Sequence, residues 1–284
     1  MPEINSDSRL QQATMWAHEK LKGEPFSIET ISADASFRRY FRIVPANGKE
    51  TLVLMDAPPD KEDSRPFIDV AGRLREGGVR APVIHHFDLD LGFGILEDFG
   101  DELYRSIITQ ETAPQVFPEL FSVLEGMARN VLSGGLPNYT EEALQADLDL
   151  FTDWYLARHR NRQLTSEETR SWEFLCDALI KSAMSQPQVF VHKDFHSCNL
   201  LREPGKEPGV IDFQDAVHGP ISYDFISLVW DRYIHWPRSQ IETWMADMHQ
   251  RLQPDFALED WIRYCDLMGL QRNIKVVGIF ARLF

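Results

Sequence analysis

Apolar and polar residues follow two different periods along the chain, and the period changes near Gly100. Before that point, short apolar runs recur between turn residues, a pattern typical of β-strands. One helix is expected ahead of them, over residues 8–21, where apolar residues recur at helical spacing behind Ser8. The strand-like runs begin at Phe26, Phe37 and Thr51 and continue as APVIHHFD and GFGILEDFG.

The turn residues between these runs indicate how the strands connect. PANGKE separates the second run from the third and has the composition of a hairpin turn. RPFIDVAGRLREGG reads as a helix that begins near Pro66 and stops at Gly77 and Gly78. The first hundred residues therefore predict an antiparallel sheet of about five strands with one inserted helix.

After Gly100 the pattern becomes helical. Apolar faces recur over residues 114–132, 141–160 and 166–184, and again from Ser222 onward. Two short β runs, QVFV and PGVIDF, bracket a polar loop within this region. We therefore expect an α+β protein with two lobes, a sheet lobe over residues 1–99 and a mostly helical lobe over residues 100–284. The last residues, ARLF, lie in an apolar-rich segment without a helix stop, so we expect the natural protein to continue.

Composition limits the partners of the chain. The 29 Lys and Arg against 44 Asp and Glu give a net charge of −15, which disfavours nucleic acid and anionic membranes as partners. An anionic substrate then requires a local basic or metal site. The N-terminus lacks an export signal and no apolar stretch is long enough to span a membrane, so a cytoplasmic location is expected. The three cysteines lack paired ligand spacing, which argues against zinc and for free thiols.

The strongest chemical signal is VFVHKDFHSCNLL, in which His192, Asp194 and Asn199 have the spacing H-x-D-x-x-x-x-N. Asp212 follows at the end of the next predicted strand. Phosphoryl transfer needs cations on the nucleotide phosphates and a carboxylate at the incoming hydroxyl. The oxygens of Asn199 and Asp212 suit Mg²⁺. Asp194 then orients the acceptor hydroxyl and receives its proton, while His192 braces the loop.

The spacing alone is only suggestive, because such a triplet also arises by chance. Its context strengthens it, since an apolar run precedes it, Leu200 and Leu201 follow it, and a second strand delivers Asp212. The alternative is that His192, Asp194 and Asn199 form an ordinary turn between two buried strands.

Four segments together resemble bacterial sugar kinases of the aminoglycoside-phosphotransferase superfamily. They are VFVHKDFHSCNLL, GVIDFQDAVHGPISYDFISLVWDRY, SADASFRRYFRI and LVLMDAPPDKEDSRPFIDVAGRL. The resemblance runs from about residue 8 to the end of the chain. It implies a two-lobed, protein-kinase-like fold that uses ATP and Mg²⁺, with Asp194 as the catalytic base and Asn199 and Asp212 as metal ligands.

The resemblance also assigns residues outside the motif. Glu97, Asp98 and Phe99 of ILEDFG resemble the hinge whose backbone binds adenine. Asp224 resembles the carboxylate that ties the catalytic loop to the next helix, although a helix N-cap is an equal alternative. Asp215 is a candidate contact to substrate or to a metal-bound water, or else a solvated loop carboxylate.

One expected phosphate ligand is missing. The superfamily carries a lysine on the third strand that pairs with the nucleotide phosphates, whereas this chain has Met55 there. Arg38, Arg39 and Arg42 lie where a phosphate-covering loop is expected, and a guanidinium can fork onto phosphate oxygens. We therefore treat these three arginines as candidate nucleotide ligands, the alternative being solvated strand arginines.

The acceptor is inferred from the resemblance. Within the superfamily the motifs match kinases that phosphorylate the anomeric hydroxyl of N-acetylmuramic acid and N-acetylglucosamine to the α-1-phosphate in peptidoglycan recycling. The alternatives are an aminoglycoside or other amino-alcohol kinase and a non-catalytic nucleotide-binding pseudokinase. Trp230, Tyr233 and Trp236, on a predicted helix, are candidates for an apolar wall against a sugar, with core packing as the alternative.

Overall fold

The computed structural model describes residues 7–33 and 37–283, and the chain forms two compact units. Unit 1 comprises Met1–Glu76, Arg80–Glu102 and Leu201–Gln214, and unit 2 comprises Gly77–Val79, Leu103–Leu200 and Asp215–Phe284. The segment Leu201–Gln214 belongs to the sheet unit because Val210 N donates to Arg80 O (2.8 Å) and Phe213 stacks on Phe67. The division thus differs from a single boundary at residue 100, since the helical unit is interrupted in sequence.

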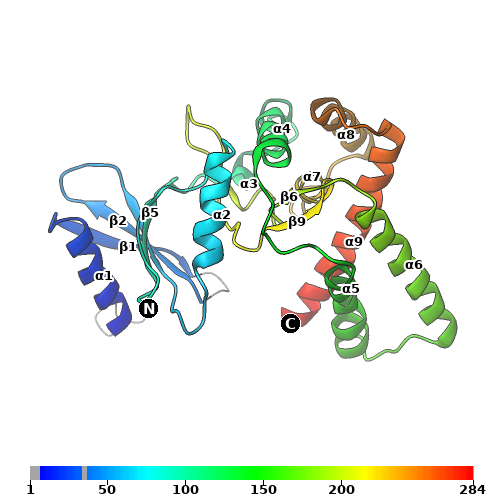
Figure 1. Cartoon of the computed structure of the whole chain (residues 1–284), viewed down its shortest axis with the longest axis horizontal. Coiled ribbons are helices and arrows are strands. Elements are labelled where there is room, and N and C mark those ends of the chain that lie inside the picture. The colour runs from blue at the N-terminus through cyan, green and yellow to red at the C-terminus, as the bar shows by residue number, and fades with distance from the viewer. Residues whose placement is uncertain (1–6, 34–36, 284) are drawn as a thin grey trace. The chain divides into compact units, whose positions relative to one another are not determined.

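Unit 1 is built on the antiparallel five-stranded sheet that the sequence predicts (Figure 1). Its strands run in the order β1-β2-β3-β5-β4. The inserted helix α2 (Arg65–Glu76) connects the third strand to the fourth. The strands are β1 (Phe26–Ala33), β2 (Arg39–Pro45), β3 (Leu52–Asp56), β4 (Ile84–Asp88) and β5 (Phe93–Glu97).

Helix α1 (Ser8–Lys20) packs on β3 and β5 of this sheet (Figure 1). It begins one residue after Asp7, whose carboxylate accepts hydrogen bonds from Arg9 N and Leu10 N and so caps the helix. Its apolar stripe is buried against inward-facing strand residues, which forms the core of unit 1. The core comprises Leu10, Ala13, Trp16, Ala17, Phe41, Ile43, Leu54, Phe93 and Ile95.

Unit 2 is mostly helical, and its long C-terminal helix α9 (Leu258–Leu283) packs against five other helices (Figure 1). These are α5 (Glu141–Leu150), η2 (Phe151–His159), α6 (Ser166–Met184), α7 (Tyr223–Val229) and α8 (Arg238–Leu252). The unit also contains α3 (Tyr104–Ile107) and α4 (Ala113–Asn130), together with the antiparallel pair of β6 (Gln188–Val191) and β9 (Val217–Pro220). The α+β class expected from the sequence is confirmed.

Residues 141–160 read as one α-helix in the sequence, but the structure divides them. Helix α5 continues into η2, a π-helix in which the chain takes a wider turn. The junction lies against α9, where a Cβ on Gly278 would stand 2.4 Å from the carbonyl carbon of Leu150. Only glycine at position 278 permits this close approach of the two backbones.

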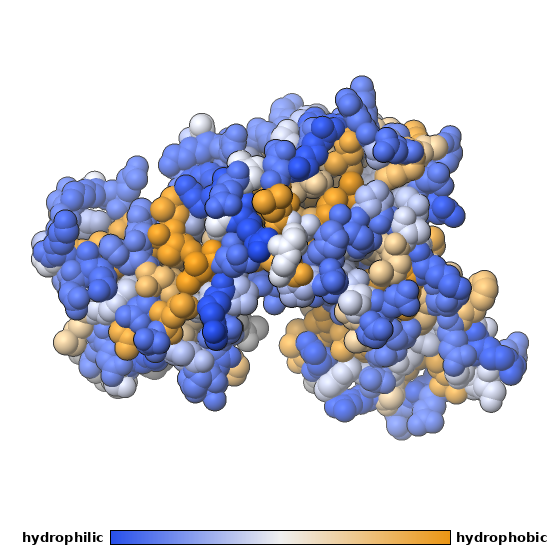
Figure 2. Space-filling view, in the orientation of Figure 1, coloured by the Kyte–Doolittle hydropathy of each residue, from blue (hydrophilic) through white to orange (hydrophobic). Residues whose placement is uncertain are grey.

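The surface is consistent with the charge of the chain. Hydrophilic residues cover most of the face shown in Figure 2. Among the residues that the structure describes, no helix is long and apolar enough to cross a membrane.

Candidate active site

The motif forms a loop, residues 192–199, between β6 and the short strand β7 (Leu200–Leu201). Its first residue, His192, is fully buried, and its Nδ1 accepts a hydrogen bond from Asp194 N (3.2 Å). A histidine that accepts at Nδ1 carries its ring proton on Nε2 when it is neutral. The ring therefore holds the backbone of Asp194 from inside unit 2. We call residues 192–199 the catalytic loop, after the role that the sequence predicts for it.

Asp224 ties the catalytic loop to helix α7. Its Oδ2 accepts from His192 N (2.6 Å) and its Oδ1 from Lys193 N (3.1 Å). The N-cap position of α7 belongs to Ser222, so Asp224 bonds to the loop and does not cap the helix. Burial raises the pKa of Asp224 to about 7, against these two hydrogen bonds and the charge of Arg272, which lower it.

Lys193, which donates to Asp224 Oδ1, has an unusual backbone conformation. Lys193 has φ 73°, in the left-handed region that L-residues with a Cβ avoid at a cost of roughly 1–2 kcal/mol. Asp224 holds its N–H in this conformation. Strained backbone of this kind persists where the surroundings determine it, as at functional sites.

Asp231 holds the catalytic loop from a second side, and the sequence analysis missed it. This buried carboxylate accepts from Ser197 N (3.1 Å) and from Ser197 Oγ, and its other oxygen accepts from Tyr233 N (3.1 Å). The available signal was an acidic residue directly after the apolar run LVW, since a buried carboxylate requires partners. The loop is thus fixed at both His192 and Ser197.

Asp194 is the half-exposed carboxylate of the loop. His196 Nε2 lies 3.2 Å and Arg232 Nη2 lies 3.7 Å from its Oδ1. Burial tends to raise the pKa of Asp194, but the hydrogen bond from His196 and the charges of Arg232 and Arg272 outweigh it and lower the pKa to about 2. At neutral pH the side chain is an ionised acceptor.

The two candidate metal ligands belong to different units. In unit 2, Asn199 Nδ2 donates to Asp194 O (2.9 Å), which fixes the orientation of the amide. In unit 1, Asp212 follows the strand β8 (Gly209–Val210) with φ 64°, and its Oδ1 accepts from Gln214 Nε2 (2.9 Å). The predicted strand PGVIDF is therefore shorter than expected and ends before Asp212. As at Lys193, a residue other than glycine adopts the left-handed conformation.

The three candidate arginines of unit 1 are ion-paired, so none is a simple solvated strand arginine. Arg39 pairs with Asp7 and with the fully buried Asp56, and Arg42 pairs with Asp98 (2.6 Å) and Asp101 (2.8 Å). The acidic partners of Arg42 hold its pKa well above the usual range.

Arg38 differs from the other two. It is 6% exposed and pairs with Glu62 (3.3 Å), which precedes α2. Met55 lies on β3, which pairs with β2 and β5, and its side chain is fully buried.

The predicted hinge begins at Glu97, the last residue of β5, and its side chains are engaged within unit 1. Arg80 binds Glu97 (3.1 Å), and Thr51 Oγ1 donates to Asp98 (2.7 Å). Phe99 is buried, and a Cβ on Gly209 would meet its ring at 2.4 Å, so glycine is required there. These side chains fix the backbone of the segment, which is the part expected to bind adenine.

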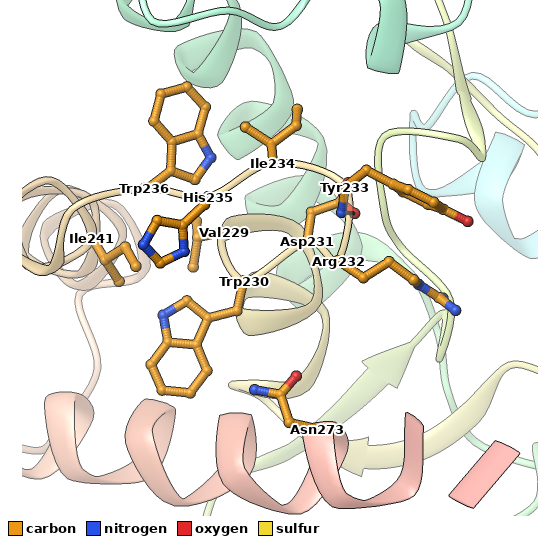
Figure 3. A pocket seen from close by; sticks show the side chains of 10 residues that line it. All are labelled: Val229, Trp230, Asp231, Arg232, Tyr233, Ile234, His235, Trp236, Ile241 and Asn273. Carbon is orange, nitrogen blue, oxygen red and sulfur yellow. Dashed lines mark hydrogen bonds between the residues drawn. The ribbon is translucent and has the colours of Figure 1, made fainter. Parts of the chain in front are cut away.

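A pocket of about 500 Å³ follows helix α7 in unit 2 (Figure 3). It is lined by Val229, Trp230, Asp231, Arg232, Tyr233, Ile234, His235, Trp236, Ile241 and Asn273. Helix α7 ends at Val229, so the three aromatic residues of the predicted helix lie in a loop instead. Trp236 is buried and stacks edge-on against Trp244, whereas Tyr233 is 44% exposed. Asp215, a candidate contact to substrate or to a metal-bound water, is exposed.

Comparison with known proteins identifies the family. The phosphotransferase enzyme family matches residues 27–263. An N-acetylmuramate/N-acetylglucosamine kinase of Pseudomonas aeruginosa is 41% identical over 99% of this chain and 86% of its own length. The kinase of the same name from Neisseria meningitidis is 35% identical over 95% of this chain and 82% of its own length.

Solved structures agree on the fold. ADP-bound aminoglycoside phosphotransferase APH(2'')-Ib has a TM-score of 0.64 at 15% identity, covering 94% of this chain and 90% of that one. The streptomycin–ATP–APH(2")-IIa complex has a TM-score of 0.63 at 14% identity, with coverages of 94% and 91%. The resemblance and the kinase-like fold expected from the sequence are thereby confirmed. The chain belongs to the phosphotransferase enzyme family, and its activity is that of a kinase.

Proposed function

We propose that the chain transfers the γ-phosphoryl group of ATP to the anomeric hydroxyl of N-acetylmuramate and N-acetylglucosamine, giving the α-1-phosphate. The acceptor is supported by one observation above all, the 41% identity over nearly the whole chain to a kinase named for these two sugars. A cytoplasmic role in cell-wall recycling follows from this chemistry, since ATP is the phosphoryl donor.

The catalytic loop supports the reaction itself. Asp194 is ionised at neutral pH and half-exposed, so its carboxylate accepts the hydrogen bond of the acceptor hydroxyl. As the acceptor oxygen forms its bond to the γ-phosphorus, the bond from that phosphorus to the bridging oxygen of ADP breaks. The proton of the hydroxyl passes to Asp194. His192, Asp224 and Asp231 keep the loop in position through the bonds described above.

The residues present fit a magnesium requirement. Asn199 and Asp212 offer an amide oxygen and a carboxylate, the hard oxygen donors that Mg²⁺ prefers, and both side chains are oriented by hydrogen bonds. A Mg²⁺ ion held by these residues would neutralise the charge of the nucleotide phosphates. We therefore propose these two residues as its protein ligands.

Of the three candidate arginines, Arg38 is best suited to bind the nucleotide phosphates. Arg39 and Arg42 each pair with two carboxylates, which neutralises them within unit 1. Arg38 is buried, and its guanidinium pairs with Glu62 (3.3 Å), just ahead of α2. A buried cation oriented by a glutamate next to that helix resembles the lysine–glutamate pair of protein kinases. Arg38 thus substitutes for the lysine that Met55 replaces.

Replacing Arg38 by Gln is expected to raise the KM for ATP roughly 10-fold, because a charge-assisted hydrogen bond to phosphate is lost. Arg38→Lys should retain part of the affinity. The measurement is the ATP dependence of turnover, with thermal unfolding to check the fold of each variant. Arg65→Gln is the matched control, since that guanidinium is 77% exposed. If folded Arg38→Gln kept the wild-type KM for ATP, a residue other than Arg38 would bind the nucleotide phosphates.

A small acceptor fits the chain better than a protein. Only residues 213–222 separate Asp212 from α7, which begins at Tyr223, and this leaves little length for a segment that docks a polypeptide.

We propose that the backbone of Glu97, Asp98 and Phe99 binds the adenine of ATP.

The test is phosphorus NMR of the protein with Mg-ATP and either sugar. We expect a sugar-phosphate resonance coupled to the anomeric proton. If neither sugar yields product while ATP binds, the acceptor assignment is wrong. Phosphorylation of kanamycin instead would favour an amino-alcohol kinase, which the fold of the solved aminoglycoside phosphotransferases also accommodates. Nucleotide binding without transfer to any acceptor would indicate a pseudokinase.

A further inference from the structure

The two proposed acceptors differ by one negative charge. N-acetylmuramate is N-acetylglucosamine with a lactyl ether on O3, which ends in a carboxylate. The chain has a net charge of −15, and Asp194, where the anomeric hydroxyl must bind, is itself ionised. Both repel the lactyl carboxylate. If the proposed function holds, a cation close to Asp194 is needed to accept the charged sugar.

Three basic side chains act on Asp194, and two of them are unsuited to this task. His196 Nδ1 accepts from Cys198 N (3.2 Å) and its Nε2 lies 3.2 Å from Asp194 Oδ1, so both ring nitrogens are already engaged within the catalytic loop. Arg272 is 3% exposed on α9 and is buried away from solvent. The remaining cation is Arg232.

Arg232 lies close to the base, and its side chain is partly exposed. Its Nη2 lies 3.7 Å from Asp194 Oδ1, its side chain is 25% exposed, and it lines the 500 Å³ pocket. In Figure 3, Arg232 and Tyr233 extend to the same side of the loop, and the guanidinium lies 5.6 Å from the centre of the Tyr233 ring. The ring of Phe280 lies at a similar distance of 5.7 Å. The guanidinium is thus supported by aromatic side chains while part of it remains accessible.

The neighbouring residue fixes this position relative to the catalytic loop. Asp231 bonds Ser197 on the loop and Tyr233 N on its own segment, so the backbone on both sides of Arg232 is anchored. In the sugar ring, C3 is two bonds from C1. A substituent on O3 therefore lies near the anomeric oxygen, and a long arginine side chain beside Asp194 can reach it. The planar fork of a guanidinium matches a carboxylate with two parallel hydrogen bonds.

We propose that Arg232 binds the lactyl carboxylate of N-acetylmuramate and thereby determines how well the enzyme uses the charged acceptor relative to the neutral one. In the absence of acceptor, Arg232 pairs with Asp194. When N-acetylmuramate binds, a second carboxylate shares the guanidinium. The neutral N-acetylglucosamine makes no such contact.

The test compares kcat/KM for the two sugars in the wild type and in Arg232→Gln. Loss of the charge next to Asp194 is expected to lower turnover of both sugars to some extent. In addition to this common loss, the ratio of kcat/KM for N-acetylmuramate to that for N-acetylglucosamine should fall roughly 10- to 100-fold, as expected for a lost charge-assisted pair. Arg232→Lys should recover part of the ratio because it keeps the charge.

Removing the charge from the ligand provides the complementary measurement. The methyl ester of N-acetylmuramic acid is neutral, so Arg232→Gln should lower its kcat/KM only as much as that of N-acetylglucosamine. Arg105→Gln is the matched control, because Arg105 also lies over the Tyr233 ring (4.0 Å) but does not line the pocket, and it should leave the ratio unchanged.

Two results would overturn the proposal. In the first, Arg232→Gln lowers kcat/KM equally for both sugars and for the ester. Arg232 would then act only through Asp194. In the second, Lys193→Gln changes the ratio and Arg232→Gln does not. The ammonium of Lys193 lies over the Tyr139 ring (5.1 Å). That outcome would assign binding of the lactyl carboxylate to Lys193 instead of Arg232. A wild type that phosphorylates neither sugar would instead contradict the proposed function.

Discussion

Asp194→Asn is expected to reduce kcat by roughly 10²- to 10⁴-fold, because the amide cannot take the proton of the acceptor hydroxyl. Asparagine has the same shape, and its Oδ1 can still accept from His196 Nε2, so the loop should keep its conformation. ATP binding does not depend on this carboxylate, so the affinity for ATP should be preserved. Steady-state turnover and a direct titration with ATP measure the two quantities separately.

Asp153→Asn is the control for this variant, since it makes the same chemical change at an exposed position on η2. It should leave both kcat and ATP affinity unaltered. If Asp194→Asn retained wild-type turnover, the general-base role would be wrong and the motif would be the ordinary turn that the sequence also allows. A loss of ATP affinity together with turnover would point to a collapsed loop instead.

Most of the sheet was predictable because its signals are local. Apolar runs alternate with turn residues in the first hundred positions, and PANGKE directs β2 back along β3 in antiparallel register. The helix-to-π transition at Phe151 was not predictable in this way. At this junction the backbone of α9 passes close to Leu150 at Gly278, a contact between segments far apart in the sequence.

The arginines show why local patterns were insufficient for the site. Arg38, Arg39 and Arg42 are equivalent in the sequence, with similar neighbours in one short segment. Their partners, among them Glu62, Asp56 and Asp98, come from distant positions that only the folded sheet brings near. The structure shows which carboxylates each arginine pairs with, and that information is absent from the local sequence.

The catalytic loop contains residues that a motif predicts and is held by a residue that the motif does not predict. The spacing of the motif predicts Asp194 as the base and Asn199 as a metal ligand, and both residues lie in the loop after β6. Asp231 carries no motif, and its role depends on Ser197, which is 34 residues away. Tyr233 and Trp236 were expected on a helix, whereas α7 stops at Val229 and the aromatic residues line a pocket in the following loop.

Asp212→Asn is expected to lower turnover roughly 10²- to 10³-fold and to raise the Mg²⁺ concentration needed for half-maximal activity. The carboxylate supplies a full negative charge to the cation, which an amide oxygen does not. Gln214 donates to Asp212 Oδ1 in the wild type, and an asparagine oxygen can accept the same bond, so the local backbone should persist. Turnover is measured as a function of Mg²⁺, and high Mg²⁺ should restore part of the loss because the site is weakened and not removed.

Asp215→Asn makes the matched comparison three residues further along the chain. Its carboxylate is exposed, so turnover should stay within about twofold and the Mg²⁺ dependence should not move. A large loss in Asp215→Asn would support the alternative that Asp215 contacts the substrate or a metal-bound water. If Asp212→Asn kept both its turnover and its Mg²⁺ dependence, Asp212 would not be a metal ligand. Its left-handed backbone, at φ 64°, would then need a structural explanation within the β8 segment instead of a catalytic one.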